Sequence, residues 1–279
     1  MKINLCGLFF TLKTEFKAAF HVKINQLLHK IPYGAVVTTA WLASHGVTSD
    51  QARKLASSGW LQRVGHGAYC QAGEPLTWES AVFALQASDD TDLPPLWPGG
   101  QTALALHGFA HYLPMGERTT HLYGKEAVRL PRWLSDAEWA GRMMLHSEKG
   151  LPAQLPGSFT DYAPDSRAFS LQVSTPERAV LEWIAVTSNE LLFSSELVDT
   201  FGGLNTLRPR RLQALLEGCR SVRTKRAFLV LARHAGHAWY GRLEPRRLDL
   251  GNGKRQLCRG GKLDREYHVT VPEAFLHAD

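Results

Sequence analysis

The sequence predicts an α+β fold, with an N-terminal winged helix-turn-helix followed by a mixed α/β region. Two observations lead to this prediction. Three short helical patterns between residues 22 and 58 precede two short strand patterns at 61–64 and 68–70. Further amphipathic helices then alternate with stretches rich in proline and glycine up to the C-terminus. A chain of 279 residues is long enough for two or three small domains, each with its own core.

The composition is that of a soluble globular protein, with 44% hydrophobic and 21% charged residues. No run reaches the roughly eighteen apolar residues that a membrane span needs. The apolar start MKINLCGLFFTL is short for a signal peptide, Lys13 and Lys17 follow it at once, and no small-residue cleavage site is evident. We therefore expect a cytoplasmic protein without a membrane partner, in which residues 1–20 form an N-terminal extension.

The cysteines and the charges give two further indications. The four cysteines are far apart and form no C-x-x-C pair, which argues against disulfides and zinc: Cys6, Cys70, Cys219 and Cys258. Residues 1–73 hold 8 Lys and Arg against 2 Asp and Glu, residues 74–204 hold 8 against 17, and residues 205–279 hold 16 against 7. Two basic ends around an acidic middle favour contact with a polyanion such as nucleic acid, although basic surfaces are often only solvated.

The first two helices of the N-terminal module are short. An apolar stripe over 22–30 indicates the first, and the sequence IPYG at 31–34 ends it. After a brief extended piece at 36–37, Thr38 is placed to cap the second helix, which ends at 45–46, where glycine tolerates a left-handed conformation.

The third helix has the clearest boundaries. Thr48 and Gln51 form a capping-box pattern, Val47 and Ala52 can form a hydrophobic staple, and Gly59 ends the helix. Its face opposite the apolar residues is polar and basic. Arginine and glutamine can bind guanine and adenine edges, while lysine and serine suit phosphates. The predicted DNA-binding residues of this helix and its cap are Thr48, Ser49, Gln51, Arg53, Lys54, Ser57 and Ser58.

The strands at 61–64 and 68–70 are joined through Gly65-His66-Gly67, which predicts a β-hairpin directly after the third helix. A hairpin in that place is the wing of a winged helix, and Arg63 and His66 near its tip would contact the DNA backbone or the minor groove. The alternative is a three-helix corner with a polar outer face, as many enzymes have. The segment by itself leaves both readings open.

The longer sequence INQLLHKIPYGAVVTTAWLASHGVTSDQARKLASSGWLQRVGHGAYCQAGEPLTWESAVFAL, with GGQTALALHGFAHYLP and HLYG after it, resembles the AbiEi-type antitoxins. These are the transcription regulators of type IV toxin–antitoxin (abortive infection) systems. The resemblance continues through STPERAVLEWIA and GHAWYGRLEPRRLDLGNGKRQLCRGGKLDREYHVTVP, so that it extends from about Val22 to the C-terminus.

The resemblance implies a winged helix at 21–73 that binds inverted repeats in double-stranded operator DNA and represses its own operon. It also implies an antitoxin domain, divided here into an acidic middle region at 74–165 and a basic region at 166–279. This domain would neutralise a cognate nucleotidyltransferase-like toxin, with or without a direct complex.

The middle region shows structural rather than catalytic patterns. A short helix is expected at 77–86, and DDTDLPPLWPGG at 89–100 is expected to be a loop and an internal boundary. GGQTALALHGFAHYLP reads as a buried helix that ends near His107. His107 and His111 have a spacing that can hold a metal, but no acid or cysteine lies near them, so we expect structural histidines and no metal or cofactor.

The stretch Ser174-Thr175-Pro176-Glu177 is a strong helix start, with a capping residue, proline in the first turn and an acid at the positive helix end. Glu177 and Arg178 could suggest a catalytic pair, but a capping role already accounts for Glu177. Known catalytic motifs are absent from the sequence, and we therefore expect no enzyme.

The C-terminal region carries a second basic surface. The segment 221–234 is amphipathic, with Arg223 and Arg226 expected to point outward, and GNGKRQLCRGGKLDREY adds basic residues on glycine-rich loops. Glycines beside Lys and Arg let backbone N–H groups approach a phosphate, although no Walker motif is present. This surface could contact DNA phosphates, face a toxin or RNA, or be only solvated. Its residues are Arg223, Arg226, Lys254, Arg255, Arg259, Lys262 and Arg265.

The leading interpretation is a DNA-binding repressor and antitoxin. One alternative is a nucleic-acid-processing enzyme that uses the basic C-terminal domain, and another is a stand-alone ligand-sensing regulator. A nucleotidyltransferase-like gene directly downstream would favour the antitoxin.

Overall fold

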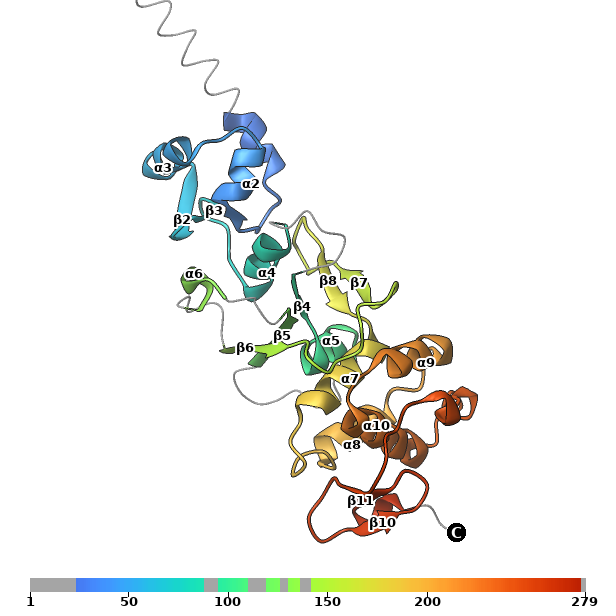
Figure 1. The fold of residues 1–279 in the computed structure, drawn as a ribbon. Helices are drawn as coiled ribbons and strands as arrows, with labels where there is room; N and C mark the ends of the chain where they lie inside the picture. Colours follow the sequence, from blue (N-terminus) through green and yellow to red (C-terminus); the bar gives the residue numbers. More distant parts are fainter. Residues whose placement is uncertain (1–23, 88–94, 110–118, 126–129, 136–141, 277–279) are drawn as a thin grey trace, which may run out of the picture. The chain divides into compact units, whose positions relative to one another are not determined.

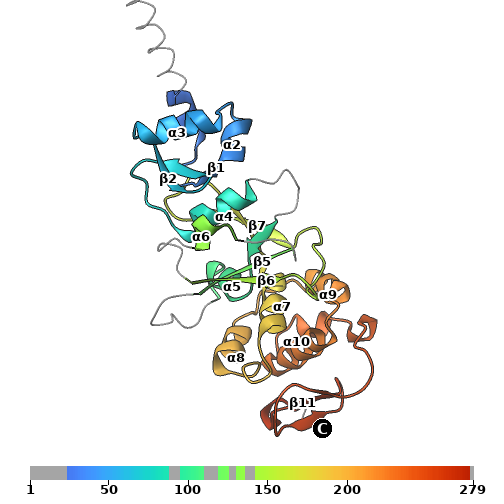
Figure 2. The same ribbon diagram turned by 60° about the vertical axis from the view of Figure 1, so that its left-hand side comes forward.

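The computed structural model describes residues 24–87, 95–109, 119–125, 130–135 and 142–276, without the side chains of Ser135 and Arg142. The chain divides into two compact units. The first comprises Met1–Ser88 with Ala163–Ser170, and the second comprises Asp89–Tyr162 with Leu171–Asp279. Both contain helices and small sheets, which confirms the α+β class (Figures 1 and 2). Residues 1–20, predicted to be an extension, lie outside the described residues.

The first unit follows the predicted order of elements. Residues 24–30 are helical. The next elements are β1 (Val37–Thr38), α2 (Thr39–Ser44), α3 (Ser49–Ser57), β2 (Leu61–Gly65), β3 (Ala68–Gln71) and α4 (Trp78–Gln86). The three strands form an antiparallel sheet in the order β1-β3-β2. The hairpin joined through Gly65-His66-Gly67 is thus confirmed, and so is the cap of α2, where the Thr38 hydroxyl accepts a hydrogen bond from the Trp41 N–H.

The core of the first unit gathers one face of each helix. Ala52 and Leu55 of α3 are 0% and 4% exposed, as the apolar spacing of that helix predicts. They pack with Ile24, Leu27, Ile31, Val37, Leu42, Leu61 and Tyr69. Because this core takes the apolar side of α3, the polar side of the helix is left exposed.

A segment far along the chain completes the first unit. We call residues 163–170, between β7 (Phe159–Tyr162) and β8 (Leu171–Ser174) of the second unit, the strap. Arg167 of the strap donates from Nη1 to the Pro75 carbonyl at 2.8 Å, and the Phe169 ring lies 4.8 Å from the Phe83 ring, centroid to centroid. A Cβ at Gly34, where φ is +74°, would lie 2.3 Å from Arg167 Nη1. The positive φ favours glycine there, and any other residue would also displace the Arg167 side chain.

The second unit begins with a mixed sheet. Its elements are β4 (Leu96–Pro98), α5 (Gly100–Leu106), β5 (Thr119–Gly124), α6 (Arg132–Ser135), β6 (Arg142–Ser147), β7 (Phe159–Tyr162) and β8 (Leu171–Ser174). Strand β5 pairs antiparallel with β4 and parallel with β6, and β7 and β8 form a separate antiparallel pair. The prediction of a loop throughout 89–100 was wrong, because β4 lies within it. Trp97 of β4 is 0% exposed, so its burial outweighs the proline and glycine around it.

Helices fill the rest of this unit. They are α7 (Pro176–Val186), α8 (Ser195–Gly202), α9 (Pro209–Gly218) and α10 (Val222–Ala235). A three-stranded sheet in the order β10-β11-β9 follows, from β9 (Arg255–Gln256), β10 (Lys262–Asp264) and β11 (Val269–Val271). In both ribbon views α10 lies between α7 and these C-terminal strands. Short 3-10 turns occupy Tyr240–Arg242, Pro245–Arg247 and Glu273–Phe275.

The start of α7 differs in detail from the prediction. Thr175 is the N-cap residue, but its hydroxyl donates to the Ser158 carbonyl and makes no capping hydrogen bond to the helix. The Glu177 carboxylate accepts a hydrogen bond from the Arg208 N–H at 2.9 Å, at the start of α9. Glu177 therefore joins two helices, where the sequence suggested that it only caps its own.

No helix in the ranges that the structure describes is long and apolar enough to cross a membrane. Cys70, Cys219 and Cys258 have free thiols. Cys6 lies outside the described residues.

Candidate nucleic-acid interface

Helix α3 is fixed at its N-terminus by a reciprocal pair of hydrogen bonds. Thr48 Oγ1 accepts from the Gln51 N–H at 3.3 Å, and Gln51 Oε1 accepts from the Thr48 N–H at 2.9 Å. These bonds satisfy two amides that have no partner within the helix, which confirms the capping box. At the other end Gly59 has φ of +78°, so the chain can turn directly into β2.

The predicted DNA-binding residues of α3 are all exposed, on the side away from the core: Thr48, Ser49, Gln51, Arg53, Lys54, Ser57 and Ser58. Arg53 forms an ion pair with Asp50, and the two side chains are 69% and 75% exposed. A pair this exposed is screened by solvent and contributes little to stability. The guanidinium can therefore exchange Asp50 for a phosphate or a base edge at little cost.

The two serines at the end of α3 are less available than the sequence suggests. Ser57 Oγ and Ser58 Oγ donate to the Lys54 carbonyl at 2.9 and 2.8 Å. A hydroxyl has one proton to donate, so either serine must rotate away from the helix before it can donate to a phosphate. Arg53 and Lys54 are therefore the principal donors on this face.

The hairpin after α3 has a fixed tip. Its register shifts between Arg63 and Gly65, and Arg63 Nε donates to the Gly65 carbonyl at 3.2 Å. The Gly67 carbonyl accepts from the Thr39 N–H at 2.9 Å, which ties the turn to the start of α2. Arg63 and His66 are exposed and follow α3 closely in the chain. The structure thus places all nine predicted DNA-binding residues on the surface of the first unit.

The second basic surface requires a correction. Arg226 was expected to point outward but is only 2% exposed, and Arg223 is half-buried. Arg223 donates to the carbonyls of Ile184 and Thr187 and to the Asn189 side chain. Burial lowers the pKa of both arginines from the usual value. The helical period of α10 predicted one buried face. The opposite face, which carries Arg226, is covered by the chain between Leu250 and His268.

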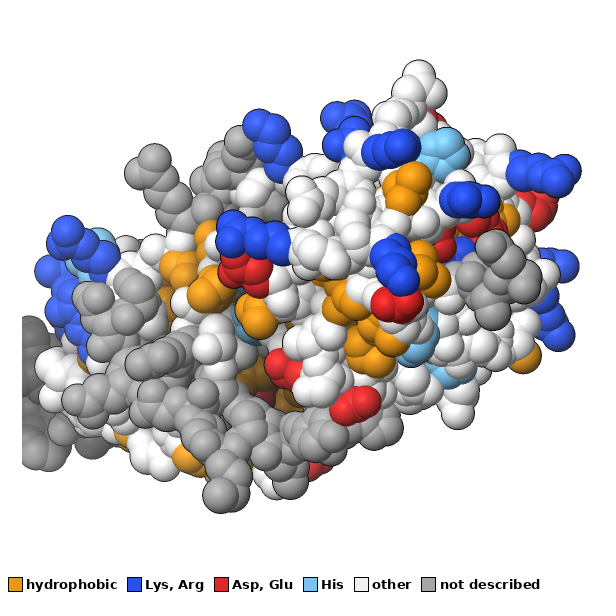
Figure 3. All heavy atoms as spheres, turned by 90° about the horizontal axis from the view of Figure 1, so that it is seen from below, with side chains coloured by type: hydrophobic (Ala, Val, Ile, Leu, Met, Phe, Trp, Pro, Cys, Tyr) orange, Lys and Arg blue, Asp and Glu red, His pale blue; other side chains and the backbone are white. Residues whose placement is uncertain are grey.

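The remaining members of the second basic surface are exposed: Lys254, Arg255, Arg259, Lys262 and Arg265. Lys262 pairs with Glu273, and Arg259 lies 4.0 Å from the Glu190 carboxylate, with all four side chains largely exposed. In Figure 3 the Lys and Arg side chains stand in separate groups, several beside an acidic side chain, rather than in one continuous patch. The basic charge of this region is therefore dispersed over the face.

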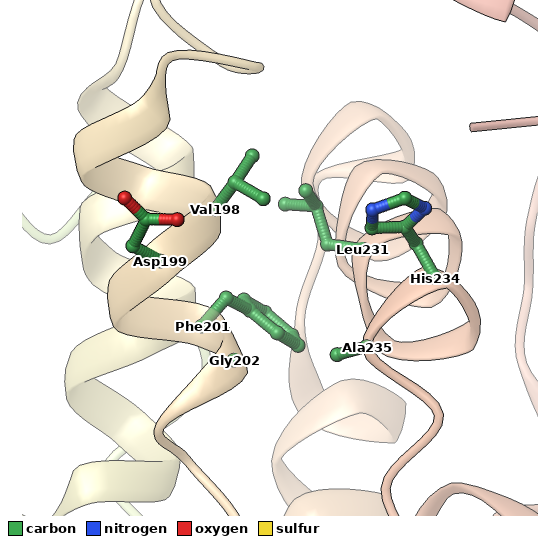
Figure 4. A pocket seen from close by; sticks show the side chains of 7 residues that line it. All are labelled: Val198, Asp199, Phe201, Gly202, Leu231, His234 and Ala235. Carbon is green, nitrogen blue, oxygen red and sulfur yellow. The ribbon is translucent and has the colours of Figure 1, made fainter. Parts of the chain in front are cut away.

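A hollow of about 590 Å³ lies between α8 and α10 (Figure 4). Phe201 points from α8 toward Ala235 of α10, while the Asp199 carboxylate lies along α8. The other lining residues are Val198, Gly202, Leu231 and His234. Asp199 and His234 are the only two lining residues with ionisable side chains, so the hollow offers few charged groups to orient a ligand.

The histidine pair proposed for the middle region can be examined in part. His107 Nε2 is 2.9 Å from the Ser174 carbonyl oxygen, a hydrogen bond that gives this histidine a structural role. His111 lies outside the described residues. Within those that are described, no group of three or more His, Cys, Asp and Glu side chains could hold a metal ion.

Comparison with known proteins identifies the family. Residues 20–115 match the model described as "Transcriptional regulator, AbiEi antitoxin N-terminal domain", and residues 117–272 match "Transcriptional regulator, AbiEi antitoxin, Type IV TA system". A search of curated proteins found no match. Among solved structures, the RV2827C protein from Mycobacterium tuberculosis has a similar fold, with 18% identity, 88% of each chain covered and a TM-score of 0.52. Since the two models together cover nearly all of it, the chain belongs to the AbiEi antitoxin family of transcriptional regulators of type IV toxin–antitoxin systems.

Proposed function

We propose that residues 21–73 of the first unit form a winged helix-turn-helix and that this protein represses its own toxin–antitoxin operon by binding inverted repeats in the operator. The observation that carries the proposal is α3, which buries Ala52 and Leu55 and exposes an unbroken polar face with two cations. A helix of this size fits the major groove of B-DNA, and the hairpin directly after it stands where a wing stands.

The residues of the interface divide into two kinds. Arg53, with its planar guanidinium, suits bidentate contacts to guanine. The Gln51 amide suits adenine in the same way once its Oε1 releases the Thr48 N–H of the capping box. Thr48, Ser49, Lys54, Ser57 and Ser58 on α3, and Arg63 and His66 on the hairpin, suit phosphates. Phosphate contacts fix the register of the protein on DNA, while base contacts choose the sequence.

The second unit, in this proposal, neutralises a nucleotidyltransferase-like toxin, and the protein itself is not an enzyme and acts in the cytoplasm. Membership of the AbiEi antitoxin family supports the antitoxin role. The nature of the toxin follows from the resemblance of the sequence to that family.

A gel-shift titration with DNA from upstream of the gene, against scrambled DNA and over a range of salt, tests the repressor role. We expect specific binding that Arg53→Ala with Lys54→Ala abolishes. Loss of the Arg53 contact alone should cost about 1–3 kcal/mol of discrimination between bases. Loss of the Lys54 contact should weaken binding to all sequences and flatten the salt dependence by about one unit.

The control is Lys149→Ala with Arg210→Ala, which removes the same charge from exposed positions of the second unit. Equal loss in both double variants would mean that net charge rather than α3 determines binding. Equal affinity for operator and scrambled DNA would contradict the proposal.

Co-expression with the toxin gene tests the antitoxin role. The Arg53→Ala, Lys54→Ala variant should still restore growth, because neutralisation belongs to the second unit. Failure of the unaltered protein to restore growth would contradict this half of the proposal and leave the repressor half standing.

A further inference from the structure

Every partner of the buried Arg226 guanidinium in the described part of the chain is a backbone carbonyl. Nε donates to Leu250 at 2.8 Å, Nη2 to Gly251 at 3.0 Å, and Nη1 to Gly253 and His268 at 2.8 and 3.1 Å. No carboxylate forms an ion pair with it in the part of the chain that the structure describes. The side chain therefore holds the segment 250–255 in place, while none of the described carboxylates balances its positive charge.

This arrangement also orients the amides of the segment. In a trans peptide the carbonyl of one residue and the N–H of the next point in opposite directions. Since the carbonyls of Gly251 and Gly253 point inward to Arg226, the N–H groups of Asn252 and Lys254 point away from it. Neither amide has an acceptor among the described residues, and both residues are exposed.

Glycine makes this conformation possible. Gly251 and Gly253 have φ of +61° and +77°, in the left-handed region that other residues rarely adopt. Alternating conformations of this kind aim successive N–H groups at one point, and such a concave group of amides binds anions. The nearby Asp249 carboxylate is occupied, because it accepts from the Gly251 N–H at 2.9 Å.

Two more cations stand on the same segment. Lys254 and Arg255 are exposed and without an ion pair among the described residues, and the Arg255 N–H donates to the same His268 carbonyl that Arg226 contacts. Burial and then the like charge of Arg255 lower the pKa of Arg226. His268 itself is exposed and has φ of +53°, a strained value for a residue other than glycine. A bound anion would relieve the repulsion.

We propose that the segment 250–255, which we call the Arg226 loop, binds a backbone phosphate of a nucleic-acid strand through the Asn252 and Lys254 amides and the Lys254 and Arg255 side chains. Residues 251–256 are all exposed, so the site is open, as suits one phosphate of a long polyanion. The inference does not depend on α3. The sequence signal for this site was the pair of glycines beside Lys-Arg, whereas Asn252 and His268 were missed.

The test uses the full chain carrying Arg53→Ala and Lys54→Ala, so that the α3 contact is removed from every measurement. Binding of a short fluorescein-labelled single-stranded RNA, and of the same sequence as DNA, is measured by fluorescence anisotropy over a range of salt. Adding Lys254→Gln and Arg255→Gln should weaken binding roughly tenfold and make the salt slope shallower by about 0.7, the value for one lost phosphate contact on a single strand. Adding Arg242→Gln and Arg246→Gln instead, two exposed arginines elsewhere in the second unit, should change neither quantity.

Equal effects in the two variants would overturn the proposal, because they would show a response to net charge alone. Unchanged binding in the loop variant would overturn it as well. Competition with inorganic phosphate shows whether the natural ligand of the site is a nucleic-acid strand or a small free anion. Displacement by low concentrations of phosphate would assign the site to a free anion and reject the strand. Unchanged thermal unfolding of both variants shows that the fold is intact.

Discussion

Arg178 and Glu182 form an ion pair at the centre of the second unit, in which Nε lies 2.7 Å from Oε1 and both side chains are 0% exposed. The Glu182 carboxylate also accepts hydrogen bonds from Trp97 Nε1, the Gly100 N–H and Ser174 Oγ, at 2.9, 3.1 and 2.8 Å. One carboxylate on α7 thereby binds groups from β4, α5 and β8.

The guanidinium side of the pair is equally enclosed. Arg178 Nη1 donates to the carbonyls of Pro152 and Ala153, each at 3.0 Å, and the charged group lies 5.0 Å from the Trp97 ring centroid. Gly99 has no room for a side chain beside this pair, because a Cβ would lie 2.3 Å from Glu182 Oε2. The two motifs GGQTALALHG and STPERA thus meet at one buried pair.

Glu182→Ala should destabilise the protein by about 3–5 kcal/mol, because it leaves a buried arginine without its counter-charge. The measurement is urea unfolding followed by circular dichroism. Glu190→Ala, at an exposed carboxylate of the same unit, is the control and should change the stability by less than about 0.5 kcal/mol. Similar stabilities for the two variants would show that the pair does not hold the unit together.

Phe169→Ala should loosen the first unit although it lies more than eighty residues beyond α4. Phe169 is 7% exposed and its ring packs at a tilt against that of Phe83 on α4, and truncation of such a ring costs about 3–5 kcal/mol. Hydrogen exchange followed by mass spectrometry should show faster exchange in residues 24–86. Ser170→Ala, at the exposed neighbouring position, is the control. Faster exchange confined to the second unit would contradict the role of the strap.

Thr48→Ala should cost about 1 kcal/mol of stability, because the capping box at the start of α3 is lost. Thr48→Ser keeps the hydroxyl and should restore most of it. Thermal unfolding gives the stability, and hydrogen exchange of the α3 amides shows whether the loss is local. If Thr48→Ala and Thr48→Ser unfolded at the same temperature, the hydroxyl would not be stabilising the helix.

The folded protein should lose stability in acid through His121 and His146. His121 lies on β5 and His146 on β6, and their two rings are stacked on each other. His121 Nδ1 is 2.9 Å from His146 Nε2, and a hydrogen bond between these nitrogens requires a neutral imidazole. Burial, followed by the charge of His121, lowers the pKa of His146 from 6.5 to about 4, and burial also lowers the pKa of His121. Between pH 6.5 and about pH 4, the unfolded chain therefore binds more protons than the folded chain.

It follows that this contribution to stability is present above pH 6.5 and is lost as the pH falls from 6.5 toward about 4. Unfolding midpoints measured across this range should fall less steeply for His146→Gln than for the unaltered protein. His29→Gln, at an exposed histidine of the first unit, should leave the slope unchanged. The same slope in all three proteins would contradict this account.

Local chemistry let the sequence predict much of the first unit. The boundaries of α3 follow from Thr48, Gln51 and Gly59, and each of these acts on residues no more than a few positions away. The hairpin likewise follows from the glycines between two short strands. The polar face of α3 was predictable as well, because a helix with one buried stripe must expose the other side.

Only the tertiary structure decided which residues cover the faces of each element that the local pattern does not mark as buried. Helical spacing marked Arg226 as outward, yet the chain from Leu250 to His268 supplies carbonyls that enclose it. Proline and glycine marked 89–100 as a loop, yet Trp97 is buried there beside Arg178 and Glu182. The strap joins the first unit from positions far along the chain. The physical reason is the same in each case: capping and periodicity depend on near neighbours, whereas burial and charge pairing depend on residues that only the fold brings together.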